Sequence, residues 1–138
     1  MKICVTGGSG FIGSSLVNSL VSSNYEVTVM DIFEPNNKDA LLLMASVDYA
    51  RASFQSGLQH AEMALALYPA DPWCYLLVAR GYRYSGILDL AEMQILSGLE
   101  FTLVGSNQYR LLCVEASAIY LALGREKEAE LWLDKADQ

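Results

Sequence analysis

The chain has 138 residues, of which 53% are hydrophobic and 18% are charged. This composition favours a packed globular protein and argues against intrinsic disorder. Nine lysines and arginines stand against 16 aspartates and glutamates, giving a formal net charge of −7. Because an acidic surface repels phosphate backbones, we expect no nucleic-acid partner.

Cysteine and histidine, the residues that most often carry metal or nucleophile chemistry, are sparse. Cys4, Cys74 and Cys113 stand far apart, and His60 is the only histidine. This pattern fits neither a disulfide framework nor a zinc site, so we predict reduced thiols in a cytoplasmic protein, no metal and a surface histidine. No Ser-His-Asp or Cys-His arrangement can be argued, and no catalytic residue is predicted.

The uncharged stretch from residue 3 to residue 25 is a candidate membrane segment by its lack of charge alone. Glycine, serine, threonine and asparagine interrupt it throughout. A bilayer span needs about 20 predominantly apolar residues, and glycines break the apolar core that a signal peptide needs. We therefore expect neither a membrane span nor export.

The first segment, residues 1–38, has the pattern of one strand–helix–strand unit. Ile3-Cys4-Val5 is a short apolar run that ends at a glycine-rich turn. Apolar residues from Ile12 to Val21 recur at helical spacing, and a β-branched run, Val27-Thr28-Val29-Met30, ends at Asp31. The segment is therefore predicted to be a Rossmann-like βαβ unit with the usual right-handed crossover.

The turn after the first predicted strand carries a glycine motif that suits a phosphate group. Gly7, Gly10 and Gly13 follow the G-x-x-G-x-x-G spacing. Gly7 permits the tight turn, Gly10 lets a pyrophosphate approach the backbone, and Gly13 lets the helix pack on the strand. Asp31, after the second strand, can accept hydrogen bonds from ribose hydroxyls, which favours NAD over NADP.

The run Val5-Thr6-Gly7-Gly8-Ser9-Gly10-Phe11-Ile12-Gly13-Ser14-Ser15-Leu16-Val17 resembles the extended short-chain dehydrogenase/reductase family of NAD-dependent epimerases and dehydratases. The resemblance covers about residues 1–34. It implies NAD binding through Gly7, Gly10, Phe11, Ile12, Gly13 and Asp31. It also implies a catalytic Tyr-x-x-x-Lys, yet no tyrosine of this chain has lysine at the fourth position. Two readings stay open: a catalytically incomplete NAD-binding remnant, or a unit that only packs.

The second segment, residues 39–138, contains an internal repeat. Tyr82, Gly86 and Ala91 return 38 residues later as Tyr120, Gly124 and Ala129, and 34 residues earlier as Asp48, Ala52 and Gly57. Each unit is predicted to be two helices, at about 39–53 and 56–68, 72–85 and 88–102, and 107–123 and 125–137. The small residues let paired helices approach closely, and Gly86 and Gly124 supply left-handed helix caps.

These units resemble tetratricopeptide (TPR) repeats, in about three copies. The predicted fold class is therefore mainly α, with TPR-like hairpins preceded by a single Rossmann-like βαβ unit. The resemblance implies a non-enzymatic adaptor or chaperone that binds a peptide or a partner helix in a concave groove lined by the first helix of each pair. The groove positions so implied are Leu42, Ser46, Tyr49, Trp73, Leu76, Arg80, Arg83, Tyr84, Leu111, Val114, Ala118 and Leu121.

Within that groove, Arg80 and Arg83 lie one turn apart between aromatic residues, and they form a cationic patch in an acidic chain. Arginine pairs bidentately with carboxylates, and aromatic side chains anchor peptides. The alternative is an ordinary solvated face with salt bridges to neighbouring acids. The last helix also presents Leu131, Trp132 and Leu133, which predicts a homodimer or a heteromeric complex that buries Trp132. The alternative is a last helix that folds back in a monomer, burying Leu133 against the preceding helix and leaving Trp132 only partly exposed.

Overall fold

A computed structural model describes residues 2–6, 26–30 and 38–138. Strands β1 (Lys2–Thr6) and β2 (Glu26–Met30) pair in parallel, with Lys2 opposite Glu26 and Thr6 opposite Met30. Parallel strands need a crossover between them, as the sequence pattern expects. The predicted helix from Ile12 to Val21, the glycine motif and Asp31 lie outside the described residues, so the βαβ unit stays a prediction.

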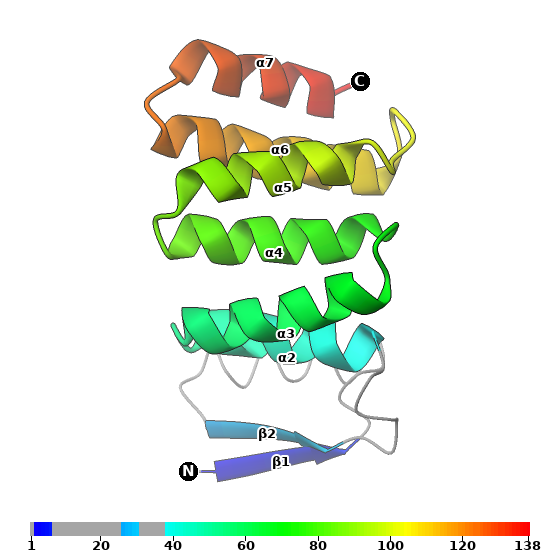
Figure 1. The fold of residues 1–138 in the computed structure, drawn as a ribbon, viewed down its shortest axis with the longest axis vertical. Coiled ribbons are helices and arrows are strands. Elements are labelled where there is room, and N and C mark those ends of the chain that lie inside the picture. Colours follow the sequence, from blue (N-terminus) through cyan, green and yellow to red (C-terminus); the bar gives the residue numbers. More distant parts are fainter. Residues whose placement is uncertain (1, 7–25, 31–37) are drawn as a thin grey trace. The chain divides into compact units, whose positions relative to one another are not determined.

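Six helices follow, and Figure 1 shows that the two helices of each successive pair run in opposite directions. They are α2 (Lys38–Ala50), α3 (Phe54–Leu67), α4 (Pro72–Tyr84), α5 (Leu88–Leu99), α6 (Asn107–Ala122) and α7 (Glu126–Ala136). They pair as α2 with α3, α4 with α5 and α6 with α7. The mainly helical architecture is therefore confirmed, with helix ends within a few residues of those predicted.

The chain divides into two compact units, Met1–Leu67 and Tyr68–Gln138. The first contains the strands and the α2–α3 hairpin, and the second contains the α4–α5 and α6–α7 hairpins. The predicted boundary between residues 38 and 39 stays a prediction. Among the described residues, no helix combines the length and apolar character that crossing a bilayer requires.

Three turns with the same hydrogen bonds join the helix pairs. In each, a backbone N–H donates to the carbonyl oxygen five residues earlier: Ser53 to Asp48 at 2.8 Å, Ile87 to Tyr82 at 2.9 Å and Arg125 to Tyr120 at 2.9 Å. The residue before each donor has a positive φ, of 60° at Ala52, 76° at Gly86 and 78° at Gly124. These are helix ends of the Schellman type, and they fall at the repeat positions that the sequence predicted.

Local capping explains where two of the first helices of the pairs begin. The Asp71 carboxylate accepts from the N–H of Trp73 at 2.9 Å, and Pro72 occupies the first helical position of α4. The Ser106 hydroxyl accepts from the N–H of Tyr109 at 3.1 Å and caps α6. Such caps satisfy N–H groups that have no partner within the helix.

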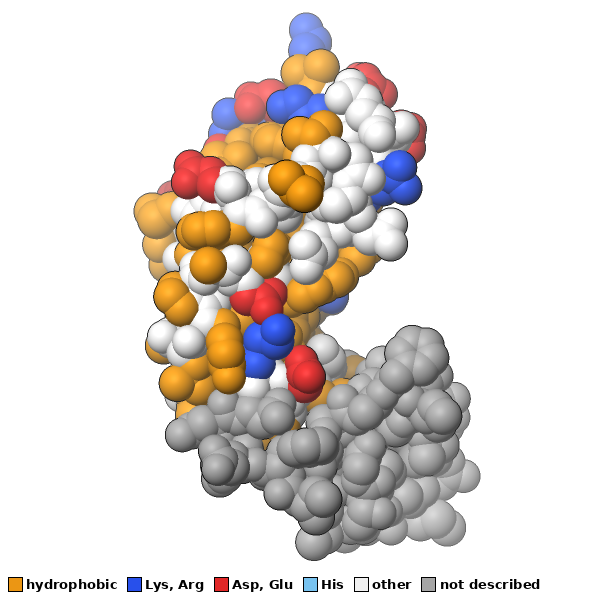
Figure 2. All heavy atoms as spheres, turned by 90° about the vertical axis from the view of Figure 1, so that its right-hand side faces the viewer, with side chains coloured by type: hydrophobic (Ala, Val, Ile, Leu, Met, Phe, Trp, Pro, Cys, Tyr) orange, Lys and Arg blue, Asp and Glu red, His pale blue; other side chains and the backbone are white. Residues whose placement is uncertain are grey.

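The core of the second unit lies where both helices of the α4–α5 hairpin meet α6. Its buried members are Leu76, Ala79, Ala91, Ile95, Leu112, Ala116 and Ile119. Close approach depends on small residues: a Cβ added at Gly98 would lie 2.5 Å from Cβ of Tyr75 and 3.0 Å from Cδ2 of Leu112. Figure 2 shows one face of the molecule, on which hydrophobic side chains in orange also reach the surface between polar ones.

Candidate protein-interaction surface

A buried carboxylate joins α4 to α6. Glu115 of α6 is only 4% exposed, although it carries a charge. Its Oε2 accepts from Nε of Arg80 at 3.2 Å, and its Oε1 accepts from Nε of Arg83 at 2.6 Å. A buried charge is costly unless it is paired, and here two arginines of α4 share one carboxylate. The predicted patch is therefore a mixed cluster with a single net positive charge.

The pKa of Arg83 reflects its strong interaction with Glu115. Burial by itself lowers the pKa of Arg83, but the hydrogen bond and charge of Glu115 outweigh that effect, so the pKa is raised. The Arg83 guanidinium also lies 4.8 Å above the centre of the Tyr84 ring. Arg83 is thus held between an acid and an aromatic face, a favourable place for a cation.

The structure separates the predicted groove residues into exposed and buried ones. Tyr84 is 40% exposed, and Trp73 is partly buried against the core. The side chains of Arg80 and Arg83 keep 33% and 25% of their surface. Tyr49 and Leu76 are buried, so they serve packing and we leave them out of the proposed groove.

The burial of Tyr49 has a local cause that the groove pattern did not include. A Cβ added at Gly57 of α3 would lie 2.5 Å from Cε1 of Tyr49 in α2. The missing side chain of Gly57 makes room for the tyrosine ring between the paired helices. Leu76 is buried for a different reason, since it belongs to the core shared with α6.

The outer side of α6 presents an apolar surface. Leu111, Val114 and Leu121 are 45%, 48% and 55% exposed, and Ala118 lies between them on the helix. Residues three, four and seven positions apart share one helical face, so these side chains form a continuous stripe. The stripe flanks the Glu115 cluster, which faces α4.

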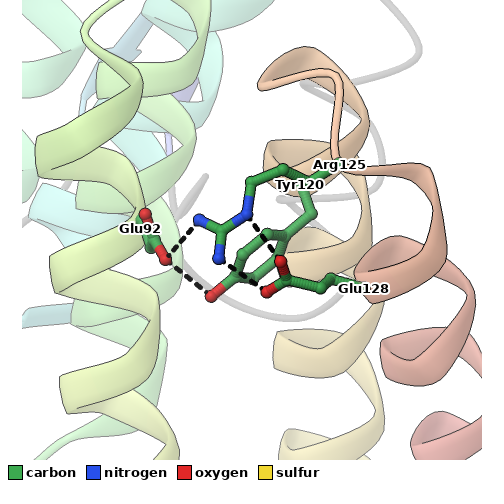
Figure 3. Close-up of polar contacts among 4 residues, drawn as sticks. All are labelled: Glu92, Tyr120, Arg125 and Glu128. Carbon is green, nitrogen blue, oxygen red and sulfur yellow. Dashed lines mark hydrogen bonds and ion pairs between the residues drawn. The ribbon is translucent and has the colours of Figure 1, made fainter.

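A second polar cluster, which the sequence did not predict, joins α5, α6 and the turn before α7 (Figure 3). Oε1 of Glu92 accepts from the Tyr120 hydroxyl at 2.7 Å and from Nη1 of Arg125 at 3.2 Å. Arg125 also makes two bonds of 2.7 Å to the carboxylate of Glu128. Burial, followed by the hydrogen bond to Glu92, raises the pKa of Tyr120 to about 12.

Trp132 of α7 packs back onto this cluster. Its ring stacks on that of Tyr120 with centroids 6.3 Å apart, and Nζ of Lys135 lies 4.0 Å from its centroid. Trp132 is partly buried against the core, whereas Leu131 and Leu133 are 59% and 45% exposed. The partial burial of Trp132 agrees with the alternative interpretation, in which the last helix folds back, but the burial of Leu133 that this interpretation also expects is wrong.

His60 has a partner that the sequence did not suggest. Its Nδ1 lies 2.8 Å from Oδ2 of Asp48, and the same oxygen accepts from the Ser56 hydroxyl at 2.9 Å. Both groups therefore bond to the aspartate, whereas nucleophile activation requires the serine to bond to the histidine. Cys74 and Cys113 are buried thiols outside any disulfide. No cluster of metal-ligating side chains occurs within the described residues.

Comparison with known proteins finds different relatives for the two segments. Residues 3–60 match the NAD dependent epimerase/dehydratase family. The chain is 49% identical over 37 residues to the "Putative UDP-glucose 4-epimerase" of Methanocaldococcus jannaschii, which is 27% of this chain and 12% of that protein. It is 44% identical over 46 residues to "UDP-glucuronic acid decarboxylase 1" of Arabidopsis thaliana, 33% of this chain and 11% of that protein. The matches thus span only about a ninth of these relatives.

Solved structures with a similar fold are helical. The globular C-terminal domain of P. aeruginosa LpoP has a TM-score of 0.70 at 19% identity and covers 77% of this chain and 99% of that one. The Yersinia enterocolitica type III secretion translocator chaperone SycD scores 0.66 at 18% identity, covering 75% of each chain. TTC0263, a TPR protein of Thermus thermophilus, has a TM-score of 0.67 at 18% identity and covers 90% of this chain and 62% of that one. The TPR-like fold of the helical part is thereby confirmed.

Proposed function

We propose that this protein is a non-enzymatic protein–protein interaction module that binds a peptide or a partner helix along α4 and α6. The observation that carries the proposal is the apolar stripe of α6 beside the aromatic and cationic residues of α4. Apolar and aromatic anchors with nearby arginines are typical of interface centres. Buried Cys74 and Cys113, outside any disulfide, favour a reducing compartment, so we propose a cytoplasmic location.

The groove that we propose is lined by Trp73, Arg80, Arg83 and Tyr84 of α4 and by Leu111 and Ala118 of α6. The two arginines outnumber Glu115, so the surface suits a ligand that combines apolar anchors with a carboxylate. Arg80 bonds to Glu115 through Nε, and the other edge of its planar guanidinium suits a ligand carboxylate.

Selection of peptides from a random display library on the full chain tests this proposal. We expect selected peptides to share an aromatic or aliphatic residue near an acidic one. Their affinity should fall about tenfold with Tyr84→Ala and with Arg80→Lys, which keeps the charge beside Glu115 but loses the planar fork. Met93→Ala is the matched control, because Met93 is 56% exposed on α5, away from the groove. Equal losses in all three variants would refute the groove.

A second candidate function is dinucleotide binding by the first segment. The parallel pairing of β1 with β2 and the family match over residues 3–60 favour it. We propose that Gly7, Gly10 and Gly13 would approach the pyrophosphate and that Asp31 would accept from the ribose. Isothermal titration of the full chain with NAD tests this proposal. Micromolar binding that Asp31→Ala abolishes would support it, and a heat of NAD binding that is the same in the native chain and the variant would contradict it.

A further inference from the structure

The α4–α5 hairpin packs against α6 through an apolar surface, and the α6–α7 hairpin has an equivalent surface of its own. Leu76 and Ile95, 4% and 0% exposed, belong to the core that packs against α6. The repeat of 38 residues places Val114 and Leu133 at the equivalent positions of the last hairpin. There, the two side chains are 48% and 45% exposed. The last hairpin therefore repeats the apolar contact surface of the second, and Figure 1 places α7 at the outer end of the second unit.

The same comparison identifies what a helix covering this surface must lack. In the second hairpin, Arg80 and Arg83 hold Glu115 of the incoming helix α6. Thirty-eight residues later the equivalent positions are Ala118 and Leu121. An acid at the position of Glu115 would be buried there without a partner, which is strongly unfavourable. The covering helix must therefore carry an apolar or small residue at that point.

An acidic residue of each hairpin lies at the other end of this contact surface. Glu92 of the second hairpin accepts from the Tyr120 hydroxyl and from Arg125 of the incoming hairpin. Its equivalent in the last hairpin is Glu130, which is exposed and pairs with no other described residue. A donor at the end of a covering helix, arginine above all, would complete the pattern.

From this equivalence we infer that the last hairpin binds an amphipathic helix of another protein, apolar throughout its contact face and basic at its C-terminal end. The surface consists of Val114, Leu121, Glu130 and Leu133, which we term the end face. A second copy fits less well, because α7 carries four acids against two lysines and two such helices would repel each other.

A peptide derived from the chain itself serves as the probe. It comprises residues 107–125 with Cys113→Ser, which prevents oxidation, and Glu115→Ala, which suits Ala118 and Leu121. We expect it to bind the full-length protein in a fluorescence anisotropy titration. Val114→Asp and Leu133→Asp in the protein should each weaken binding at least about tenfold, since each places a charge in an apolar contact. Tyr84→Ala should leave it unchanged, because Tyr84 lies on α4 and is not part of the end face.

A specificity exchange sharpens the test. The protein variant Ala118→Arg with Leu121→Arg recreates the arginine pair of α4 on α6. It should prefer the peptide that retains Glu115, whereas the native protein should prefer the Glu115→Ala peptide, each by about tenfold or more. Circular dichroism checks that the variant folds, and both side chains lie on the open side of α6.

Joining the Glu115→Ala peptide to Gln138 through a Gly/Ser linker raises its effective concentration to about the millimolar range. The tethered protein should then melt at a higher temperature than the same protein with Val114→Asp. Absence of that difference would overturn the proposal, as would peptide binding that ignores the end-face substitutions. Light scattering that finds a dimer abolished by Leu121→Arg would assign the end face to a second copy and overturn the choice of partner.

Discussion

Two clusters of arginine and glutamate connect the helices of the second unit, and they are opposites in composition. In one, the buried Glu115 lies between Arg80 and Arg83. In the other, Arg125 lies between Glu92 and Glu128, and its side chain is 44% exposed. Their bond lengths are similar, from 2.6 to 3.2 Å.

The difference in burial decides what each cluster contributes. Removing the partners of a buried charge leaves that charge desolvated, whereas water replaces the lost partner at an exposed one. The Glu115 cluster therefore controls whether α4 and α6 stay packed, and the Arg125 cluster mainly orders the turn before α7. The two clusters thus have similar bond lengths but contribute very differently to the stability of the fold.

The largest effect is expected from breaking the buried cluster. Replacing both Arg80 and Arg83 with methionine keeps most of the packing volume but leaves the Glu115 carboxylate without a charged partner. We expect the free energy of unfolding to fall by about 3–5 kcal/mol, the usual cost of stranding a buried charge. Urea unfolding followed by circular dichroism measures it.

The rescue variant separates charge from packing in this experiment. Adding Glu115→Leu to the double methionine variant removes the stranded carboxylate, so most of the lost stability should return. If the double variant is as stable as the native protein, then Glu115 reaches water and the comparison between the two clusters fails.

The cluster around Arg125 includes Tyr120, whose phenol titrates in the alkaline range. The pKa of Tyr120 is raised to about 12 by burial first and by Glu92 next, with Glu128 adding to the rise and Arg125 opposing it. The folded state thus holds the phenol proton more tightly than the unfolded chain. This contribution is complete below about pH 10 and is lost as the pH rises towards 12.

Tyr120→Phe removes the titrating group, so its stability should depend less on pH between about 10 and 12 than that of the native protein. The difference between the two curves should reach up to about 2 kcal/mol. Chemical unfolding across this pH range measures it, with Tyr84→Phe as the control at an exposed tyrosine. Parallel curves for Tyr120→Phe and the native protein would contradict the assignment.

The sequence predicted the hairpins well because their signals are local. Gly86 and Gly124 are required by the left-handed φ of a helix end. The spacing predicts even the weakest of the three repeats, in which Ala52 adopts the same left-handed conformation without being a glycine. Spacing was enough, because each turn involves only neighbouring residues.

The partners within the clusters could not be predicted in the same way. Glu115 lies 35 residues from Arg80, and Glu92 lies 33 residues from Arg125, so both contacts depend on how hairpins stack. One signal was present: Glu115 interrupts an otherwise apolar run from Leu111 to Ala116. A lone acid within such a run indicates a buried charge, and a buried charge needs a cationic partner.

The turns provide a smaller test, because Gly124 directly precedes the arginine of the exposed cluster. Nothing lies within 4 Å of a Cβ added there, so Gly124→Ala probes backbone strain alone. We expect a loss of about 1 kcal/mol, since left-handed alanine is strained. Ala52→Gly should have the opposite sign and stabilise by up to about 1 kcal/mol. Thermal unfolding of both variants checks the pair, and equal signs would contradict a shared turn geometry.

The smallest effect is expected from Arg125→Gln, which removes the charge of the exposed cluster but keeps a hydrogen-bonding group. Glu92 retains the Tyr120 hydroxyl, and Glu128 is exposed enough for water to replace the lost partner. The variant should therefore melt slightly below the native protein at low salt. At about 1 M salt the Debye length shrinks to about 3 Å, so the difference should vanish. The double methionine variant should keep its deficit at both salt concentrations, because salt screens buried charges far less. A loss for Arg125→Gln that persists at high salt would mean that position within the fold, rather than exposure to water, sets the strength of both clusters.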